Sequence, residues 1–288
     1  MMQTVEVVLD CGMGNQMFQY ALGRSLATRL GLPLVLDVSI LRRYPEFGFD
    51  LGHFRLGQQQ LRDWPYLFSR ARIELVRVAA SLGLQAARLV TEPGLLFAPE
   101  ILDVDGPCVV QGYWQSERYF ESIAEQLREE FSMIRGQDPR SAECERHIRG
   151  VSSIGLHIRR GDYVSSPDCN AFHGVCPREY YDASLRLIQS KLGQDAELFV
   201  FSDDMKWARE NIRYELPTTY VDWNQNRNYE DLRLMRSCRA LIMANSTFSW
   251  WGGWLNPRPD KLAVAPRQWY QAPGVISDLP NSSWLVTL

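Results

Sequence analysis

The chain has 288 residues, 45% of them hydrophobic and 23% charged, and a formal net charge of −3, as is typical of a globular protein. The lack of a long basic run argues against a nucleic-acid partner, and no run of 18 apolar residues is present that would span a membrane. The N-terminus has no secretory signal pattern and the six cysteines are expected to be unpaired, so we expect a cytoplasmic protein, with peripheral attachment to the inner membrane left open.

The first half of the chain begins with a strand–helix–strand pattern. The apolar run Val5 to Leu9 predicts a buried strand, and a glycine-bearing turn follows it. Apolar residues then recur at helical spacing from Gln16 to Leu30, and Gly31 is placed to end that helix. Pro33 to Val38 predicts the next strand, so this unit indicates a parallel sheet covered by helices.

The middle of the chain is less regular. The stretch from Arg42 to Gly106 contains aromatic and proline-punctuated loops, with a helix predicted at Ser69 to Leu89. A strand at Val109 to Gly112 and a helix at Tyr119 to Phe131 are expected after it. The polar segment Gly136 to Ser141 is the candidate crossing between two domains.

The second half alternates strands and helices again. The predicted strands are Ser153–Ile158, Leu198–Phe201, Thr219–Asp222, Ala240–Ala244 and Leu262–Ala265. The predicted helices are Pro177–Leu192, Met205–Ile212, Asn228–Ser237 and Phe248–Leu255. We therefore predict an α/β protein with two Rossmann-like, doubly wound domains, 1–140 and 141–288, that face a central cleft. In such sheets ligands bind beyond the carboxyl ends of the strands.

A basic loop follows the first strand of the second half. It reads His157-Ile158-Arg159-Arg160-Gly161-Asp162-Tyr163. Arginine presents a planar fork of donors to phosphate oxygens and stays charged, and Gly161 lets the backbone turn where a side chain would block it. From spacing alone, a phosphate grip and a solvated surface turn are equally good interpretations.

Three other strand ends carry polar or glycine-bearing turns. Gly12-Met13-Gly14-Asn15-Gln16 opens a helix whose unpaired N–H groups suit a phosphate, although a simple tight turn is the commoner explanation. Ser202-Asp203-Asp204 offers carboxylates to a nucleobase or caps the next helix. Asn245-Ser246-Thr247 is either a helix cap or a phosphate cup, and we expect Trp250, Trp251 and Trp254 behind it to pack the helix.

Two patterns resemble metal sites and are set aside. Asp103-Val104-Asp105 precedes Gly106-Pro107, which favours an acidic turn. Cys169, His173 and Cys176 lack the paired spacing of structural zinc and an evident fourth ligand. We therefore expect no bound metal.

Five blocks, taken in order, resemble one family. They are Gly12–Ala21, His157–Tyr163, His173–Cys176 with Tyr180-Tyr181, Phe201–Asp204 and Asn245–Trp251. Together they resemble the α-1,2-fucosyltransferases of glycosyltransferase family 11, from about residue 8 to about residue 266. Cys11 departs from the family's commoner glycine before this first block. The segment Arg42 to Gly106 matches least.

The resemblance implies a GT-B-like fold and an inverting transfer of L-fucose from GDP-fucose to the 2-hydroxyl of a terminal β-galactoside, with no metal or other cofactor. It places Arg159 and Arg160 against the donor diphosphate and His157 and Asp203 against the nucleoside. Ser246, Thr247 and Phe248 complete that pocket, whereas Gly14 and Asn15 approach the diphosphate or fucose from the other domain. Asp162 is the candidate catalytic base, with a structural role beside an arginine as the alternative.

Two other classes of protein remain open from the sequence. Gly12-x-Gly14 with Asp37 suggests a nicotinamide-dependent oxidoreductase, but Met17 stands where a third glycine is expected. The nine tryptophans suggest a non-catalytic carbohydrate-binding protein, which gives the arginine pair no purpose. The identity of the acceptor and the oligomeric state cannot be read from the sequence.

Overall fold

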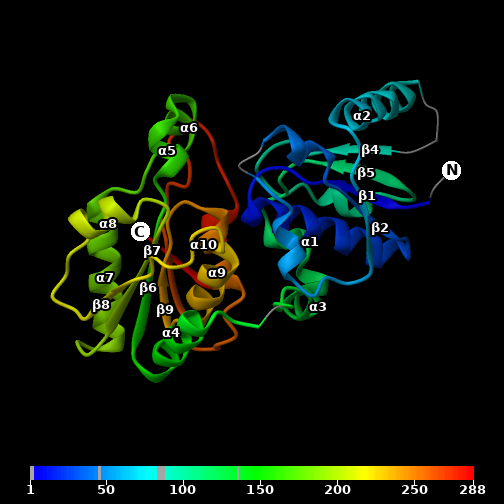
Figure 1. Cartoon of the computed structure of the whole chain (residues 1–288). Helices are drawn as coiled ribbons and strands as arrows, with labels where there is room; N and C mark the ends of the chain where they lie inside the picture. Colours follow the sequence, from blue (N-terminus) through cyan, green and yellow to red (C-terminus); the bar gives the residue numbers. More distant parts are fainter. Residues whose placement is uncertain (1–2, 45–46, 83–87, 135) are drawn as a thin grey trace. The chain divides into compact units, whose positions relative to one another are not determined.

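The computed structural model describes residues 3–44, 47–82, 88–134 and 136–288. The chain divides into two compact units, Met1–Arg135 and Gly136–Leu288, and each contains one parallel β-sheet flanked by helices (Figure 1). Two Rossmann-like units were expected, and this is confirmed. The division falls slightly before the predicted boundary at 140, because Asp138 already caps the first helix of the second unit.

The sheet of the first unit has the strand order β3-β2-β1-β5-β4. The strands are β1 (Val5–Val8), β2 (Leu34–Asp37), β3 (Gln59–Arg62), β4 (Arg88–Thr91) and β5 (Cys108–Gln111), and all neighbours are parallel. The helices are α1 (Met13–Leu30), α2 (Tyr66–Ser81) and α3 (Ala124–Glu130). Helices α1 and α2 lie on opposite sides of the sheet (Figure 1).

Helix α1 passes very close to the central strand. A Cβ built on Gly23 would lie 2.1 Å from Cγ2 of Val7 in β1, so glycine permits this approach. The helix ends where Gly31 adopts a left-handed conformation with φ 63° and its N–H reaches the carbonyls of Ala27 and Thr28. The predicted helix and its end at Leu30 are confirmed, but it begins at Met13 and not at Gln16, so Gly14 and Asn15 belong to its first turn.

Two predictions for the first unit were wrong in detail. The helix expected from Ser69 to Leu89 ends at Ser81, and Leu89 lies in strand β4; residues 83–87 are outside the described ranges. The helix expected from Tyr119 to Phe131 is reduced to α3, because short 3₁₀ turns precede it. Strand β3 escaped prediction because it is a partly exposed edge strand with two glutamines and no apolar run.

The sheet of the second unit has the order β11-β10-β9-β6-β7-β8, again with parallel neighbours. Its strands are β6 (Ser153–Ile158), β7 (Glu197–Ser202), β8 (Thr218–Tyr220), β9 (Ala240–Ile242), β10 (Leu262–Ala265) and β11 (Leu285–Thr287). Its helices are α4 (Pro139–Gly150), α5 (Gly161–Ser165), α6 (Pro167–His173), α7 (Arg178–Leu192), α8 (Met205–Asn211), α9 (Asn228–Ser237) and α10 (Thr247–Trp254). Strand β11 and helices α4 to α6 were not predicted.

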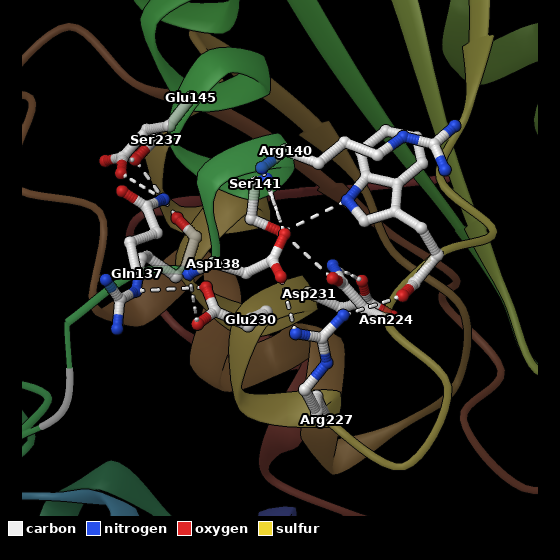
Figure 2. Close-up of polar contacts among 12 residues, drawn as sticks. Gln137, Asp138, Arg140, Ser141, Glu145, Asn224, Arg227, Glu230, Asp231 and Ser237 are labelled. Atoms are coloured by element: carbon white, nitrogen blue, oxygen red, sulfur yellow. Dashed lines mark hydrogen bonds and ion pairs between the residues drawn. The ribbon is translucent and has the colours of Figure 1, made fainter.

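A polar network fastens the start of α4 to the start of α9 (Figure 2). Ser141 donates to Asn224 Oδ1 at 2.9 Å, and Asn224 Nδ2 donates to Asp231 Oδ1 at 2.8 Å. Arg227 Nη1 donates to Asp138 Oδ2 at 2.7 Å. Burial raises the pKa of Asp231 to about 7. The entry of the chain into the second unit is therefore held by side-chain hydrogen bonds as well as by apolar packing.

The strand orders locate where each sheet can take a ligand. In doubly wound sheets the loops diverge at the point where the strand order reverses, and ligands bind there. This point lies between β1 and β5 in the first unit and between β6 and β9 in the second. Within the described ranges, no helix is both long and apolar enough to cross a bilayer, and all six cysteines are unpaired, as expected.

Candidate functional site

The arginine pair leaves β6 directly beside two aspartates that leave β7. Strands β6 and β7 are in register with Ile158 opposite Ser202, so the next two residues of each strand end are neighbours. Arg159 Nη1 lies 3.1 Å from Asp203 Oδ2. Arg160 Nε lies 3.1 Å from Asp204 Oδ2. The parallel register therefore matches two positive charges with two negative ones.

The two arginines differ in their surroundings. The guanidinium of Arg160 lies 4.1 Å from the ring centroid of Trp207, and its side chain is only 18% exposed. Arg159 is 33% exposed and also donates to Asp162 Oδ1 at 2.6 Å. Arg160 is thus packed into the unit by a stacked ring and an ion pair. Arg159 is the more accessible cation at this edge of the sheet.

Asp203 anchors the loop through the backbone as well. Its Oδ1 accepts a hydrogen bond from the Arg160 N–H at 2.8 Å, while its Oδ2 pairs with Arg159. Gly161, the first residue of α5, leaves room for this carboxylate, because a Cβ there would lie 2.7 Å from Asp203 Oδ2. The glycine in the basic loop is therefore required by a close approach.

His157 is a neutral imidazole at the end of β6. It is 5% exposed, and burial together with the charge of Arg159 lowers its pKa to about 3. Its ring packs against Phe248 with centroids 5.7 Å apart. Its Nδ1 is buried and has no hydrogen-bond partner in the structure, so this nitrogen is a group that a ligand could satisfy.

The turn between β9 and α10 lies on the other side of the same reversal point. Ser246 is the N-cap of α10 in an extended conformation, and its side chain makes no capping hydrogen bond. Tyr163 Oη donates to the carbonyl of Asn245 at 3.3 Å, which joins α5 to this turn. The backbone N–H groups at the start of α10 carry partial positive charge suited to a phosphate.

The tryptophans of α10 pack the core, as predicted. Trp250 and Trp251 are fully buried and Trp254 is 3% exposed. The indole Nε1 of Trp250 donates to the carbonyl of Leu279 at 3.2 Å. These rings are therefore not available as platforms for a sugar.

In the first unit, the predicted glycine turn forms the end of β1 and the start of α1. Cys11 adopts a left-handed φ of 62° there, which is strained for a residue with a side chain. Gly14 lies in the first turn of α1 and is buried. Asn15 Oδ1 accepts a hydrogen bond from Gln115 Nε2 at 2.9 Å, and Cys11 Sγ lies 3.5 Å from Tyr113 Oη.

The loop after β5 was missed from the sequence, although it faces the glycine turn across the reversal point of this sheet. Trp114 is fully buried and has a left-handed φ of 61°. Glu92, after β4, accepts hydrogen bonds from the N–H groups of Tyr113 at 2.7 Å and Trp114 at 2.6 Å. Burial raises the pKa of Glu92. The available sequence signal was the polar and aromatic run Gly112–Ser116 directly after a predicted strand.

Comparison with known proteins fits this geometry. Residues 105–284 match the family described as Glycosyl transferase family 11. The chain belongs to glycosyl transferase family 11. It is 33% identical to the O-antigen biosynthesis glycosyltransferase WbnK of Escherichia coli, over 96% of this chain and 98% of that protein.

Two further relatives carry more specific names. The alpha-1,2-colitosyltransferase of Escherichia coli is 32% identical, over 94% of this chain and 93% of that protein. Galactoside alpha-(1,2)-fucosyltransferase 1 of Bos taurus is 26% identical, over 50% of this chain and 42% of its own length. The family predicted from the five sequence blocks is therefore confirmed.

The fold of this family 11 glycosyltransferase is similar to that of a solved fucosyltransferase. NodZ alpha-1,6-fucosyltransferase, soaked with GDP-fucose, gives a TM-score of 0.53 at 16% identity, with 89% of this chain and 94% of that chain covered. At this identity the likeness concerns the fold alone. It confirms the GT-B-like class with two Rossmann-like units.

The structure brings most of the predicted site residues of the glycosyltransferase to one edge of the second unit. His157, Arg159 to Asp162, Asp203 and the segment Ser246–Phe248 surround the reversal point between β6 and β9. Gly14 and Asn15 lie at the corresponding point of the first unit. Three contacts beside the glycine turn were not predicted: Gln115 with Asn15, Tyr113 with Cys11, and Glu92 with the backbone of their loop.

A pocket of about 240 Å³ lies beside this edge in the second unit. Its polar lining includes His173, Asn245, Gln268 and Gln271. Asn245 Nδ2 donates to the carbonyls of His173 at 2.9 Å and Trp269 at 3.2 Å, so its side chain fixes the loops around the pocket. In the described part of the chain, no three His, Cys, Asp or Glu side chains are gathered so that they could hold a metal ion.

Proposed function

We propose that this glycosyltransferase moves L-fucose from GDP-fucose to the 2-hydroxyl of a terminal β-galactoside, with inversion, to form an α-1,2 linkage without a metal ion. The names of two relatives, an alpha-1,2-colitosyltransferase and a galactoside alpha-(1,2)-fucosyltransferase, support the linkage and the acceptor class. The solved fucosyltransferase soaked with GDP-fucose supports a guanosine diphosphate donor.

The observation that carries the proposal is Arg159, an accessible arginine fixed by two carboxylates. Its guanidinium lies 5.3 Å from the ring centroid of Tyr163, whose hydroxyl donates to the Asn245 carbonyl in the turn before α10. As the bond between fucose C1 and the diphosphate breaks, negative charge grows on GDP. Fixed cations and helix-terminal N–H groups stabilise that charge, and removing one such donor typically costs about 3–4 kcal/mol. We assign the diphosphate to Arg159, with Arg160 supporting it, and to the backbone of Ser246 and Thr247.

The nucleoside is assigned to His157 and Phe248. The neutral ring of His157 offers a buried nitrogen that can hydrogen-bond a base or ribose, and Phe248 packs beside it. The family resemblance also implies a nucleoside contact for Asp203. Because both oxygens of Asp203 already hold the arginine loop, we propose that Asp203 acts on the nucleotide through that loop. Gly14 and Asn15 are proposed to approach the diphosphate or fucose from the first unit.

Asp162 is the proposed base that takes the proton of the acceptor hydroxyl. Its side chain is 44% exposed and pairs with Arg159 through Oδ1. In Asp162→Asn we expect kcat to fall about 100- to 10,000-fold, the usual contribution of a positioned base, with GDP affinity intact by calorimetry. A matching loss of GDP affinity would instead assign Asp162 to holding Arg159.

A second donor is favoured by one relative. Colitose is fucose without its 3-hydroxyl, and the alpha-1,2-colitosyltransferase is 32% identical to this chain. The proposal is tested by incubating the protein with GDP-fucose or GDP-colitose and a panel of galactose-terminated acceptors, with and without EDTA. Linkage and anomeric configuration are read by NMR. Transfer only from GDP-colitose would replace the fucose assignment, and transfer of either sugar to water alone would overturn the acceptor.

A further inference from the structure

Helix α2 of the first unit exposes an unusual amount of apolar surface. We define the α2 stripe as Leu67, Phe68, Leu75, Val78 and Leu82, whose exposed fractions lie between 53% and 73%. The helical turn continues through Leu82, since its N–H donates to the carbonyl of Val78 at 3.1 Å. At about 100° per residue these five side chains fall within a sector of roughly 100° on one face of the helix.

The opposite face of α2 is fixed to the unit. Ile73 is 4% exposed and packs with Val8 and Val109 of the sheet. Ser69 is buried and donates to Asp37 Oδ2 at 2.7 Å, and Arg72 pairs with the buried carboxylate of Glu6. These contacts fix which face of α2 packs on the first unit, and the α2 stripe lies on the side away from that unit's core.

The surroundings of the α2 stripe are positively charged. Among the described residues, the exposed charges on α2 and on the segments at its N-terminal end are those of Arg42, Arg43, Arg70 and Arg77 against Asp63 and Glu74. Four positive and two negative charges leave an excess of two positive charges, although the whole chain has a formal net charge of −3. Trp64, 40% exposed, and Tyr66 stand at the start of the helix.

We propose that the α2 stripe docks the first unit onto the surface of an anionic lipid bilayer, with α2 lying in the interface. An apolar face bordered by arginines and by amphipathic aromatic rings is the pattern of an interfacial helix. The stripe lies on a single helix with its backbone hydrogen bonds satisfied, so it offers no strand edge to an extended peptide. The excess of arginine complements lipid phosphate. This docking is independent of which sugar the enzyme transfers.

The test is co-sedimentation of the full-length protein with vesicles. Phosphatidylglycerol mixed with phosphatidylethanolamine supplies the anionic surface, and phosphatidylcholine supplies the neutral one. We expect binding to the anionic vesicles that weakens with added salt. The double variant Leu67→Glu/Leu75→Glu should bind at least about tenfold more weakly, because two apolar side chains that would be buried in the bilayer interface are replaced by charged ones.

Two matched variants separate the contributions. Ile276→Glu alters an equally exposed apolar residue of the second unit and should bind like the parent. Arg70→Gln/Arg77→Gln should weaken binding to anionic vesicles about threefold or more. GDP affinity and melting temperature should be unchanged in every variant, which confirms folding. Equal vesicle binding by parent and Leu67→Glu/Leu75→Glu overturns the proposal. The proposal is also overturned if light scattering shows that the parent is a dimer and that Leu67→Glu/Leu75→Glu is a monomer. The α2 stripe would then contact a second copy of the chain.

Discussion

Asp203 offers the sharpest test of how the donor site is built. Its carboxylate accepts the Arg160 N–H at 2.8 Å and pairs with Arg159 at 3.1 Å. In Asp203→Ala both arginines lose this anchor, although neither is itself changed. We expect GDP affinity to fall because the positive charges are no longer held where the diphosphate binds.

The size of the effect follows from the two contacts. A hydrogen bond from a backbone N–H to a charged carboxylate contributes about 1.5–3 kcal/mol. The Arg159 ion pair is 33% and 26% exposed, so solvent screens it and it contributes about 0–1 kcal/mol. A loss of about 2–3 kcal/mol corresponds to roughly 30- to 150-fold in the dissociation constant of GDP. Asp203→Asn keeps an oxygen acceptor and should lose only about five- to tenfold.

Calorimetric titration with GDP, ADP and pyrophosphate distinguishes an anchor from a contact to the base. If Asp203 positions the arginines, Asp203→Ala weakens all three ligands by the same factor. If it contacts guanine, GDP loses affinity while ADP and pyrophosphate do not, and that result would refute the anchor. Asp222→Asn, which removes a half-exposed ion pair with Arg209 elsewhere in the unit, serves as the control and should leave GDP affinity unchanged.

Three further predictions concern other parts of the molecule. In Glu92→Gln the loop Gly112–Gln115 loses its charged acceptor, so we expect kcat/KM for the acceptor sugar to fall about tenfold with GDP affinity unchanged. Arg159→Lys should lower kcat/KM about 100-fold and Arg160→Lys less than tenfold, because only Arg159 is accessible. Arg160→Lys should instead show the larger drop in melting temperature. The folded pKa of Asp231 is raised to about 7, so its contribution to stability is complete below about pH 4 and is lost as the pH rises through 7. Thermal melting at a series of pH values between about 4 and 8 should show that Asp231→Asn is more stable than the parent. The difference in the free energy of unfolding should grow with pH to about 1–3 kcal/mol.

The fold was predictable where the strands are buried on both faces. Continuous apolar runs such as Val5 to Leu9 and Ser153 to Ile158 correspond to the central strands β1 and β6. Edge strands carry weaker patterns, and three edge strands, β3, β4 and β11, were missed. Helix α2 was given too long an extent because apolar residues continue past Ser81; Leu89 and Val90 among them belong to strand β4, where Val90 is buried and Leu89 packs against the core.

The position of the candidate site residues at strand ends was predictable from the sequence, but the contacts between them were not. The arginine loop and the Ser246–Phe248 turn both stand directly after predicted strands, which is where doubly wound sheets bind ligands. Burial and the charge of Arg159 lower the pKa of His157 to about 3, and one of the rings packed against it is that of Phe248, far along the chain. No local pattern could show this, because the contact is created by the strand order. The left-handed backbone conformation of Trp114 is likewise not predictable, because tryptophan rarely adopts a positive φ.

The strand register explains why the basic and acidic motifs form one structure. Ile158 lies opposite Ser202 in the parallel pair of β6 and β7, so an Arg-Arg pair and an Asp-Asp pair leave the sheet side by side. Successive residues that leave a strand point in different directions. The ion pair of Arg160 with Asp204 is accordingly packed against Trp207, whereas Arg159, paired with Asp203, stays accessible. A shift of the register by one residue would exchange these environments. The accessible cation is therefore set by the pairing of two strands, and Asp203 and Asp204 determine the position of the arginines as much as the arginine loop does.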